Sequence, residues 1–259
     1  MGLDIYAGTL TRYYSHNWKS AVQEWAEKND YTFQRITPDN HSKVVEEEVS
    51  PAEVQEAVEN WRDQILGAIS RSGQVQCTLW LENNEKSYYT NKPDWDAVGA
   101  MLLVAACHTY GKPVPLTVEK DWNFMKHRLI SRLAKDKTQT WSLLRGVSLW
   151  LPLPDAFFFQ GPLPTGNVEA IGTVGGLRKE LDKLNQLVWQ ADETTIFRWA
   201  ETEGYPADRA MVPDGKLSKW RHPKHIEYDT QSLAKFAFSI FWKAIRFSEE
   251  QQVPILLDF

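Results

Sequence analysis

The sequence predicts an α+β fold, namely a helix-rich single domain around a small mixed sheet, with a division into two lobes left open. Helical periodicity occurs in more segments than the apolar–polar alternation of strands. Strand-like and helix-like segments alternate only as far as residue 111, which argues against a regular α/β sheet. At 259 residues the chain is long for one domain and short for two, and the Gly- and Pro-rich segment 155–176 is the best candidate for an internal boundary.

The first forty residues are expected to contain two strands and a helix. Residues 3–10 and 31–36 alternate between apolar and polar side chains, as strands do. Between them, Asn17 is a suitable cap for a helix over residues 18–29. Three side chains at helical spacing would form its buried stripe: Trp18, Val22 and Trp25.

The clearest local signal is a helix start at Ser50. Ser50 suits the N-cap position, Pro51 suits the first helical position, and Glu53 can complete a capping box. The helix is expected to reach about residue 70. Its buried stripe would contain Val54, Val58, Trp61, Ile65 and Ile69.

A central helix is expected in the middle of the chain. Asp94 can cap it, and Gly111 can stop it just after Tyr110. Residues 99–107 are apolar all round, which is typical of a helix that is buried on several sides. A third strand, over residues 75–81, is expected before it.

The remaining elements follow from the same signals. Asp192 and Asp229 are suitable N-caps, and Gly204 is a suitable stop. Helices are expected over residues 118–127, 129–135, 139–145, 174–191, 192–203 and 229–251, and strands over residues 147–153 and 253–257.

Twelve tryptophans are the most unusual feature of the composition. Each indole has a large apolar surface and one N–H donor, and it suits a core, an interface or a stacking platform. Those on helical stripes are expected in the core, namely Trp25, Trp61 and Trp242. Those at element ends or in loops are candidates for an interface or a ligand contact: Trp80, Trp95, Trp150 and Trp220.

Charge and composition narrow the class of protein. The net charge of −5 argues against a dedicated nucleic-acid binder. Residues 119–137 and 208–224 are locally basic, and we expect solvated surfaces there, with an anion site as the alternative. The longest apolar run, residues 97–107, is too short to span a membrane, so no membrane association is expected. The chain shows no signal-peptide pattern, and Cys77 and Cys107 suit buried free thiols, so the expected location is cytoplasmic.

The first candidate site lies at the N-terminal strand and the segment after it. An Asp on a strand, a phenol and an imidazole can form a general acid–base pocket, with Asp4, Tyr6 and His16 as the catalytic candidates. The alternative is that Asp4 is structural and pairs with Arg12 or a helix N-terminus. Three neighbours are predicted to contact a ligand: Arg12, Tyr13 and Tyr14.

The second candidate site is the polar loop of residues 82–91. It contains Tyr88 and Tyr89 and lies between Trp80 and Trp95, as in a carbohydrate- or peptide-contact surface. The alternative is an ordinary surface loop whose aromatic side chains pack onto the core.

Two weaker patterns are expected to be structural. His222 and His225 are separated by a proline and lack a third ligand signal, so no metal is predicted. Gly175 and Gly176 could place N–H groups around an anion, but a tight helix start capped by Thr173 fits better.

These features together predict a soluble cytoplasmic protein-binding module of immunity or adaptor type, which acts through an aromatic, acidic surface on a basic protein partner. No nucleophile elbow, phosphate loop, zinc spacing or dinucleotide fingerprint is present, and no cofactor is predicted. The first alternative is a small-molecule enzyme, a hydrolase or transferase, with its pocket at the first candidate site. The second is an intracellular sugar-binding module, which needs exposed indoles. The oligomeric state does not follow from the sequence.

Overall fold

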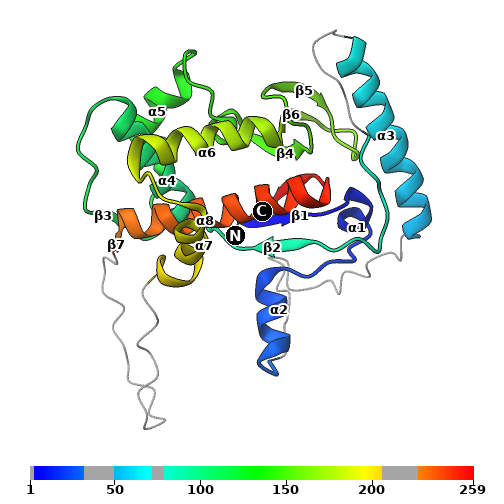
Figure 1. Ribbon diagram of the computed structural model, residues 1–259, viewed down its shortest axis with the longest axis horizontal. Coiled ribbons are helices and arrows are strands. Elements are labelled where there is room, and N and C mark those ends of the chain that lie inside the picture. The colour runs from blue at the N-terminus through cyan, green and yellow to red at the C-terminus, as the bar shows by residue number, and fades with distance from the viewer. Residues whose placement is uncertain (1–2, 32–49, 72–78, 206–226) are drawn as a thin grey trace, which may run out of the picture. The chain divides into compact units, whose positions relative to one another are not determined.

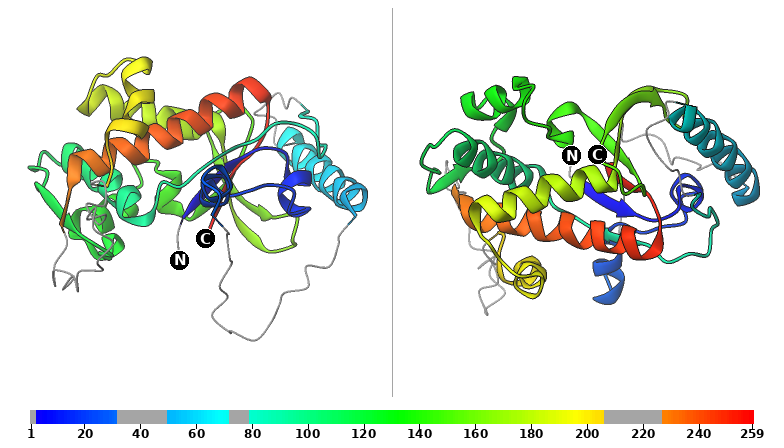
Figure 2. Two further views of the ribbon diagram at one scale, coloured as in Figure 1. Left: turned by 90° about the horizontal axis from the view of Figure 1, so that it is seen from below. Right: turned by 45° about the horizontal axis from the view of Figure 1, so that its top comes forward.

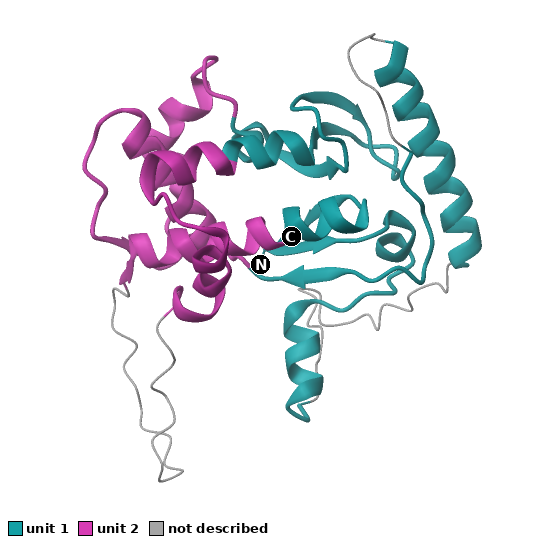
Figure 3. Cartoon of the chain, in the orientation of Figure 1, with its two compact units in different colours: residues 1–92, 141–180, 244–259 teal, residues 93–140, 181–243 magenta. Residues whose placement is uncertain are grey.

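The predicted α+β class is confirmed by the structure. A computed structural model describes residues 3–31, 50–71, 79–205 and 227–259, which contain a mixed six-stranded sheet, a two-stranded sheet and several helices (Figure 1, Figure 2). The chain divides into two compact units (Figure 3). Unit 1 contains residues 1–92, 141–180 and 244–259, and unit 2 contains residues 93–140 and 181–243.

Unit 1 is built on the six-stranded sheet, whose strand order is β2-β1-β8-β4-β6-β5. β4 and β6 are parallel, and all other neighbours are antiparallel. The C-terminal strand β8 lies inside the sheet, paired with β1 on one side and β4 on the other. The strands are β1 (Asp4–Ala7), β2 (Tyr89–Asn91), β4 (Val147–Leu151), β5 (Phe158–Pro162), β6 (Val168–Thr173) and β8 (Ile255–Asp258).

The helix predicted to start after Ser50 is confirmed as α3 (Pro51–Arg71). The Val54 N–H donates to the Ser50 carbonyl at 3.1 Å. The Trp61 Nε1–H donates to the Pro162 carbonyl at 2.6 Å, which attaches α3 to the edge strand β5. The whole predicted stripe is buried in the core of unit 1: Val54, Val58, Trp61, Ile65 and Ile69.

Unit 2 is mainly helical, and the three aspartates predicted as caps all act as caps. Asp192 and Asp229 each accept an N–H at 2.7 Å, and Asp94 accepts the Trp95 N–H at 2.9 Å. Residues 97–107 are buried throughout, which confirms the central helix. The elements with residues in this unit are α4 (Trp95–Thr109), β3 (Thr117–Glu119), η1 (Phe124–Lys126), α5 (Arg128–Lys135), α6 (Val174–Val188), α7 (Glu193–Thr202), β7 (Glu227–Asp229) and α8 (Thr230–Gln251).

The two short helices near the N-terminus are α1 (Leu10–Tyr14) and α2 (Ala21–Lys28). The predicted start of the second helix is wrong, because its cap is Ser20 and not Asn17. The Gln23 N–H donates to Ser20 Oγ, while the Ser20 N–H donates to Gln23 Oε1 at 2.7 Å. This complete capping box satisfies two N–H groups, whereas a lone cap satisfies one.

The helix predicted over residues 118–127 is wrong as well. Its first part is strand β3, which pairs with β7 from a distant part of the sequence, and its last part is the 3-10 turn η1. Pairing with a distant strand overrides local helical periodicity. Over residues 139–145 only the 3-10 turn η2 (Ser142–Arg145) forms. Residues 79–81 are not a strand, and residues 32–36 and 75–78 lie outside the described residues.

The Gly- and Pro-rich segment 155–176 contains β5 and β6, which the sequence analysis missed. Gly172 is required within β6 because a Cβ there would lie 2.7 Å from Cδ1 of Trp150. At the end of β6, Thr173 Oγ1 accepts the Gly176 N–H at 3.2 Å, which confirms Thr173 as the cap of α6. None of the described helices is both long and apolar enough to cross a membrane.

Candidate functional site

The first candidate site folds into a packed group of rings in unit 1, which we call the tyrosine cluster: Tyr6, Tyr13, Trp18 and Tyr88. β1 supplies Tyr6, α1 supplies Tyr13, and the segment before β2 supplies Tyr88. The Tyr6 ring centroid lies 5.4 Å from that of Tyr13, 5.0 Å from that of Trp18 and 5.7 Å from that of Tyr88. Tyr13 and Trp18 are stacked at 5.5 Å. The arrangement therefore joins three segments of the chain through their aromatic side chains.

Tyr6, at the centre of this cluster, is fully buried. Its hydroxyl donates to the Thr9 carbonyl at 3.0 Å, and burial raises the pKa of the phenol well above its ordinary value. A phenol that is out of contact with solvent and hydrogen-bonded to the backbone neither contacts a substrate nor exchanges a proton near neutral pH. The structure therefore places Tyr6 in the core.

The other two catalytic candidates, Asp4 and His16, differ in their exposure to solvent. Asp4 is half-buried on β1, opposite Asp258 of β8, and Asp258 Oδ1 accepts the Tyr13 hydroxyl at 2.8 Å. His16 is exposed just after α1, with a φ of 55°. Within the described part of the chain the imidazole of His16 makes no hydrogen bond. These three residues therefore do not form the acid–base pocket that the sequence predicts.

Arg12 connects the first candidate site to the loop of residues 82–91. Its Nη2 donates to the Asn84 carbonyl at 2.6 Å and its Nη1 to the Asn17 carbonyl at 3.1 Å. Its guanidinium carbon lies 5.1 Å from the centroid of the Tyr88 ring. Arg12 therefore links two segments of the chain, through its hydrogen bonds to two carbonyl groups and its contact with the Tyr88 ring.

Glu82 anchors the start of this loop in the core. Its two carboxylate oxygens accept the Trp80 Nε1–H at 2.8 Å and the Thr11 N–H at 2.9 Å. Burial raises the pKa of Glu82, and the two hydrogen bonds oppose that rise. Trp80 itself is buried, so it does not form a contact surface.

The remaining predicted binding residues are also partly enclosed. Tyr14 and Tyr89 are half-buried, and burial raises the pKa of Tyr14 to about 12. Trp95, in unit 2, is half-buried and stacked on Phe124 at 6.2 Å. These placements favour the alternative interpretation of residues 82–91, in which the aromatic side chains pack onto the core. Four residues of the sequence analysis lie outside the described residues: Cys77, Trp220, His222 and His225.

An exposed aromatic pair was missed by the sequence analysis. Trp25 was predicted in the core, but it is 58% exposed, and Tyr31 is 60% exposed. Their rings are stacked in parallel, 5.5 Å apart with an interplanar angle of 7°. Val22, one turn before Trp25, is 41% exposed. We call these three residues the α2 surface.

Local backbone geometry explains the stacking of Trp25 on Tyr31. At the end of α2 the Tyr31 N–H donates to the Ala26 carbonyl at 2.8 Å and the Asp30 N–H to the Glu27 carbonyl at 3.3 Å, while Asp30 has a φ of 57°. This is the Schellman pattern, which commonly brings the residue after the left-handed position against the last turn of the helix. The signal in the sequence was the run Asn-Asp-Tyr directly after α2.

The described residues contain no group of three or more His, Cys, Asp or Glu that could hold a metal ion. Cys107 is a buried free thiol. Comparisons of the chain with protein-family models, with curated proteins and with solved structures give no match.

Proposed function

We propose that this chain is a protein-binding module and that the α2 surface (Val22, Trp25 and Tyr31) is its contact site. The observation that carries the proposal is the stacked pair of Trp25 and Tyr31, of which each ring is more than half exposed. Among the described tryptophans Trp25 alone is exposed, while the others are buried or half-buried. Tryptophan and tyrosine dominate the energetics of protein interfaces.

The α2 surface needs little ordering before it binds. The Schellman turn holds Tyr31, and the stack holds the Trp25 ring against it. Side chains that are already fixed lose less conformational entropy on association, so more of the contact energy contributes to affinity. The pair is therefore suited to act as an anchor.

The partner is proposed to be a basic protein. The chain carries a net charge of −5, which attracts a positively charged partner over long range. The same segment supplies three carboxylates, Glu24, Glu27 and Asp30, of which Glu27 pairs with Lys19. A Lys or Arg of the partner can also lie on the open face of the Trp25 ring.

An immunity or adaptor role fits such a module, because these proteins act by shape and charge. We place it in the cytoplasm, where a buried free thiol such as Cys107 stays reduced. The sugar-binding alternative is not favoured, because it needs several exposed indoles and among the described tryptophans only Trp25 is exposed.

The test compares three variants of the tagged full chain in its native host. Trp25→Ser and Tyr31→Ser remove the two rings, and Leu116→Ser is the matched control, because Leu116 is 87% exposed and lies in the other unit. Captured proteins are identified by mass spectrometry, and a stoichiometric partner is purified and titrated against each variant. We expect a basic partner that the two ring variants bind roughly tenfold or more weakly and that Leu116→Ser binds normally.

Two results would contradict the proposal. One is equal binding of the identified partner by the wild type and both ring variants. The other is self-association of the wild type that Trp25→Ser abolishes, because the α2 surface would then be an interface between copies of this chain.

A further inference from the structure

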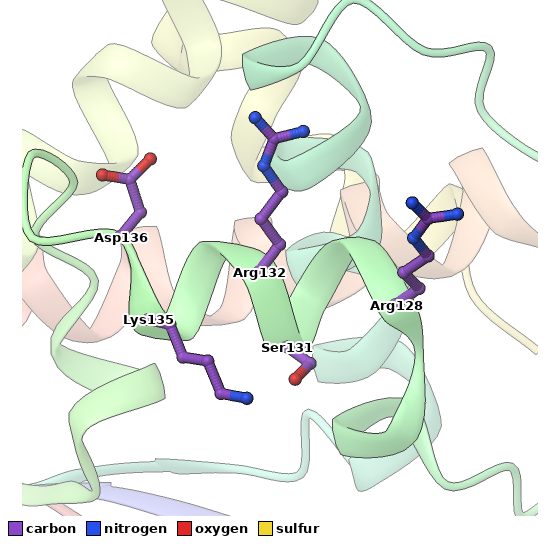
Figure 4. Close-up of a pocket in the computed structure, with 5 residues that line it drawn as sticks. All are labelled: Arg128, Ser131, Arg132, Lys135 and Asp136. Carbon is purple, nitrogen blue, oxygen red and sulfur yellow. The ribbon is translucent and has the colours of Figure 1, made fainter.

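We propose a second binding site, in unit 2, for small soluble ligands that carry two or more phosphate groups. The site is an open pocket of about 480 Å³ over α5, and Figure 4 shows the side chains that line it. Its lining residues are Arg128, Ser131, Arg132, Lys135 and Asp136.

The charge of the pocket is the first argument for an anionic ligand. Three of its five lining residues are cations, in a chain whose net charge is −5. All three are exposed, and within the part of the chain that the structure describes none of them lies within ion-pair distance of a carboxylate, although Arg132 interacts electrostatically with Asp136. They occupy positions 128, 132 and 135, which lie on one face of a helix. The opposite face holds Ile130 and Leu133 in the core, so α5 cannot rotate these charges away.

Arg132 is held in place before any ligand arrives. Its guanidinium carbon lies 3.9 Å from the centroid of the Tyr110 ring, and the Tyr110 hydroxyl donates to Asp136 Oδ2 at 3.1 Å. The other carboxylate oxygen of Asp136 accepts the Thr138 N–H at 2.9 Å and the Thr138 hydroxyl at 2.6 Å. The single acid of the pocket therefore accepts from three donors, and the guanidinium of Arg132, which also interacts with the Tyr110 hydroxyl, has further N–H donors that a ligand could use.

The spread of the charges indicates more than one anionic group on the ligand. In Figure 4 the side chains of Arg128 and Arg132 extend toward one edge of this exposed face of α5, whereas those of Lys135 and Ser131 extend toward its other edge. A chain of phosphates has the length to contact both sets, with arginines binding one group in a bidentate manner and Lys135 and the Ser131 hydroxyl binding the next.

The test is isothermal titration of the full chain with inorganic tripolyphosphate and with orthophosphate, at low salt and constant pH. Arg128→Gln and Lys135→Gln each remove one charge without touching the Tyr110 stack. Arg198→Gln is the matched control, because Arg198 is exposed on α7 of the same unit and does not line the pocket. We expect one tripolyphosphate per chain, affinity lower by roughly tenfold in Arg128→Gln and Lys135→Gln, and no change in Arg198→Gln.

Four outcomes would overturn the proposal. Tripolyphosphate could fail to bind at millimolar concentration, or Arg198→Gln could weaken it as much as the pocket variants do. Orthophosphate could bind as tightly as tripolyphosphate, which would leave no role for the spread of charges. A short RNA that binds more tightly and shares the sensitivity to Arg128→Gln and Lys135→Gln would assign the surface to nucleic acid instead. Melting temperatures of all variants show whether each is folded.

Discussion

The tyrosine cluster and the α2 surface are both made mainly of tryptophan and tyrosine, and apart from Tyr88 their residues lie within the first 31 residues of the chain. Tyr6 is fully buried, whereas Trp25 and Tyr31 are 58% and 60% exposed. The rings of the tyrosine cluster come from three segments that cover one another. The rings of the α2 surface come from one helix and the turn after it.

The difference shows that aromatic rings can be held in place by two different kinds of interaction. Tertiary packing holds Tyr6 in place, and removal of the Tyr6 side chain should expose the core. A local helix-end motif holds Tyr31 against Trp25, so those rings can be ordered and still available to a partner.

Truncation of Tyr6 and truncation of Trp25 should lower the stability of the protein by very different amounts. Tyr6→Ala removes a fully buried ring and should lower the free energy of unfolding by about 3–5 kcal/mol. Trp25→Ala should lower it by less than about 1 kcal/mol, because most of that ring is exposed. Urea denaturation measures both values. Similar losses for the two variants would mean that Trp25 is a core residue, and the contrast would fail.

Gly8 provides a second test of the packing around Tyr6. A Cβ at position 8 would lie 2.5 Å from Tyr6 Cζ, so Gly8→Ala should destabilise the protein by about 1–3 kcal/mol. In a Tyr6→Ala background the same substitution should cost little, and a double-mutant cycle measures this coupling. Gly67→Ala is the control, because the only atom near its Cβ is Arg71 Nη1 at 3.9 Å. Additive effects of Gly8→Ala and Tyr6→Ala would show that the ring has room to move.

Glu82 should give the cluster a pH-dependent stability. Burial raises the pKa of Glu82 above its ordinary value of 4.5, so the folded state favours the protonated form more than the unfolded state does. Its contribution to stability is complete below that ordinary pKa and is lost as the pH rises through the raised pKa of the folded protein. Glu82→Gln should therefore flatten the fall of unfolding free energy with rising pH.

The slope with pH is the quantity to measure, because Glu82→Gln also removes a hydrogen-bond acceptor at every pH. Glu180→Gln serves as a positive control, since burial raises the pKa of Glu180 to about 8 while Ser142 donates two hydrogen bonds to it. That variant should flatten the profile from about 4.5 to about 8. A Glu82→Gln profile parallel to that of the wild type would show that water reaches Glu82.

The smallest effect is expected at the turn that orders the α2 surface. Asp30 has a φ of 57°, which glycine adopts without strain, so Asp30→Gly should stabilise the end of α2 by up to about 1 kcal/mol. Hydrogen exchange of the Tyr31 N–H, which is bonded to the Ala26 carbonyl, reports this directly. Asn29→Gly should give no such gain, because Asn29 has a φ of −112°. Faster exchange in Asp30→Gly would mean that the Asp side chain itself stabilises the turn.

The starts of most helices follow from local capping signals that can be recognised in the amino-acid sequence. Asp94, Asp192 and Asp229 each bond an N–H within the first turn of the following helix, and the helix after Ser50 has the predicted bounds to within one residue. These interactions span at most four residues, so they can be recognised without knowledge of the rest of the chain. The buried stripe of α3 follows from helical periodicity in the same way.

The accessibility of the aromatic side chains depends on how distant segments of the chain pack. Trp80 in a loop is buried beside Glu82, and Trp25 on a periodic helix is exposed. β3 pairs with β7 from a distant segment, and the cations of α5 come together over a pocket. Accessibility, strand pairing and pocket shape depend on segments that are remote in the sequence, and a pattern of neighbouring residues does not contain that information.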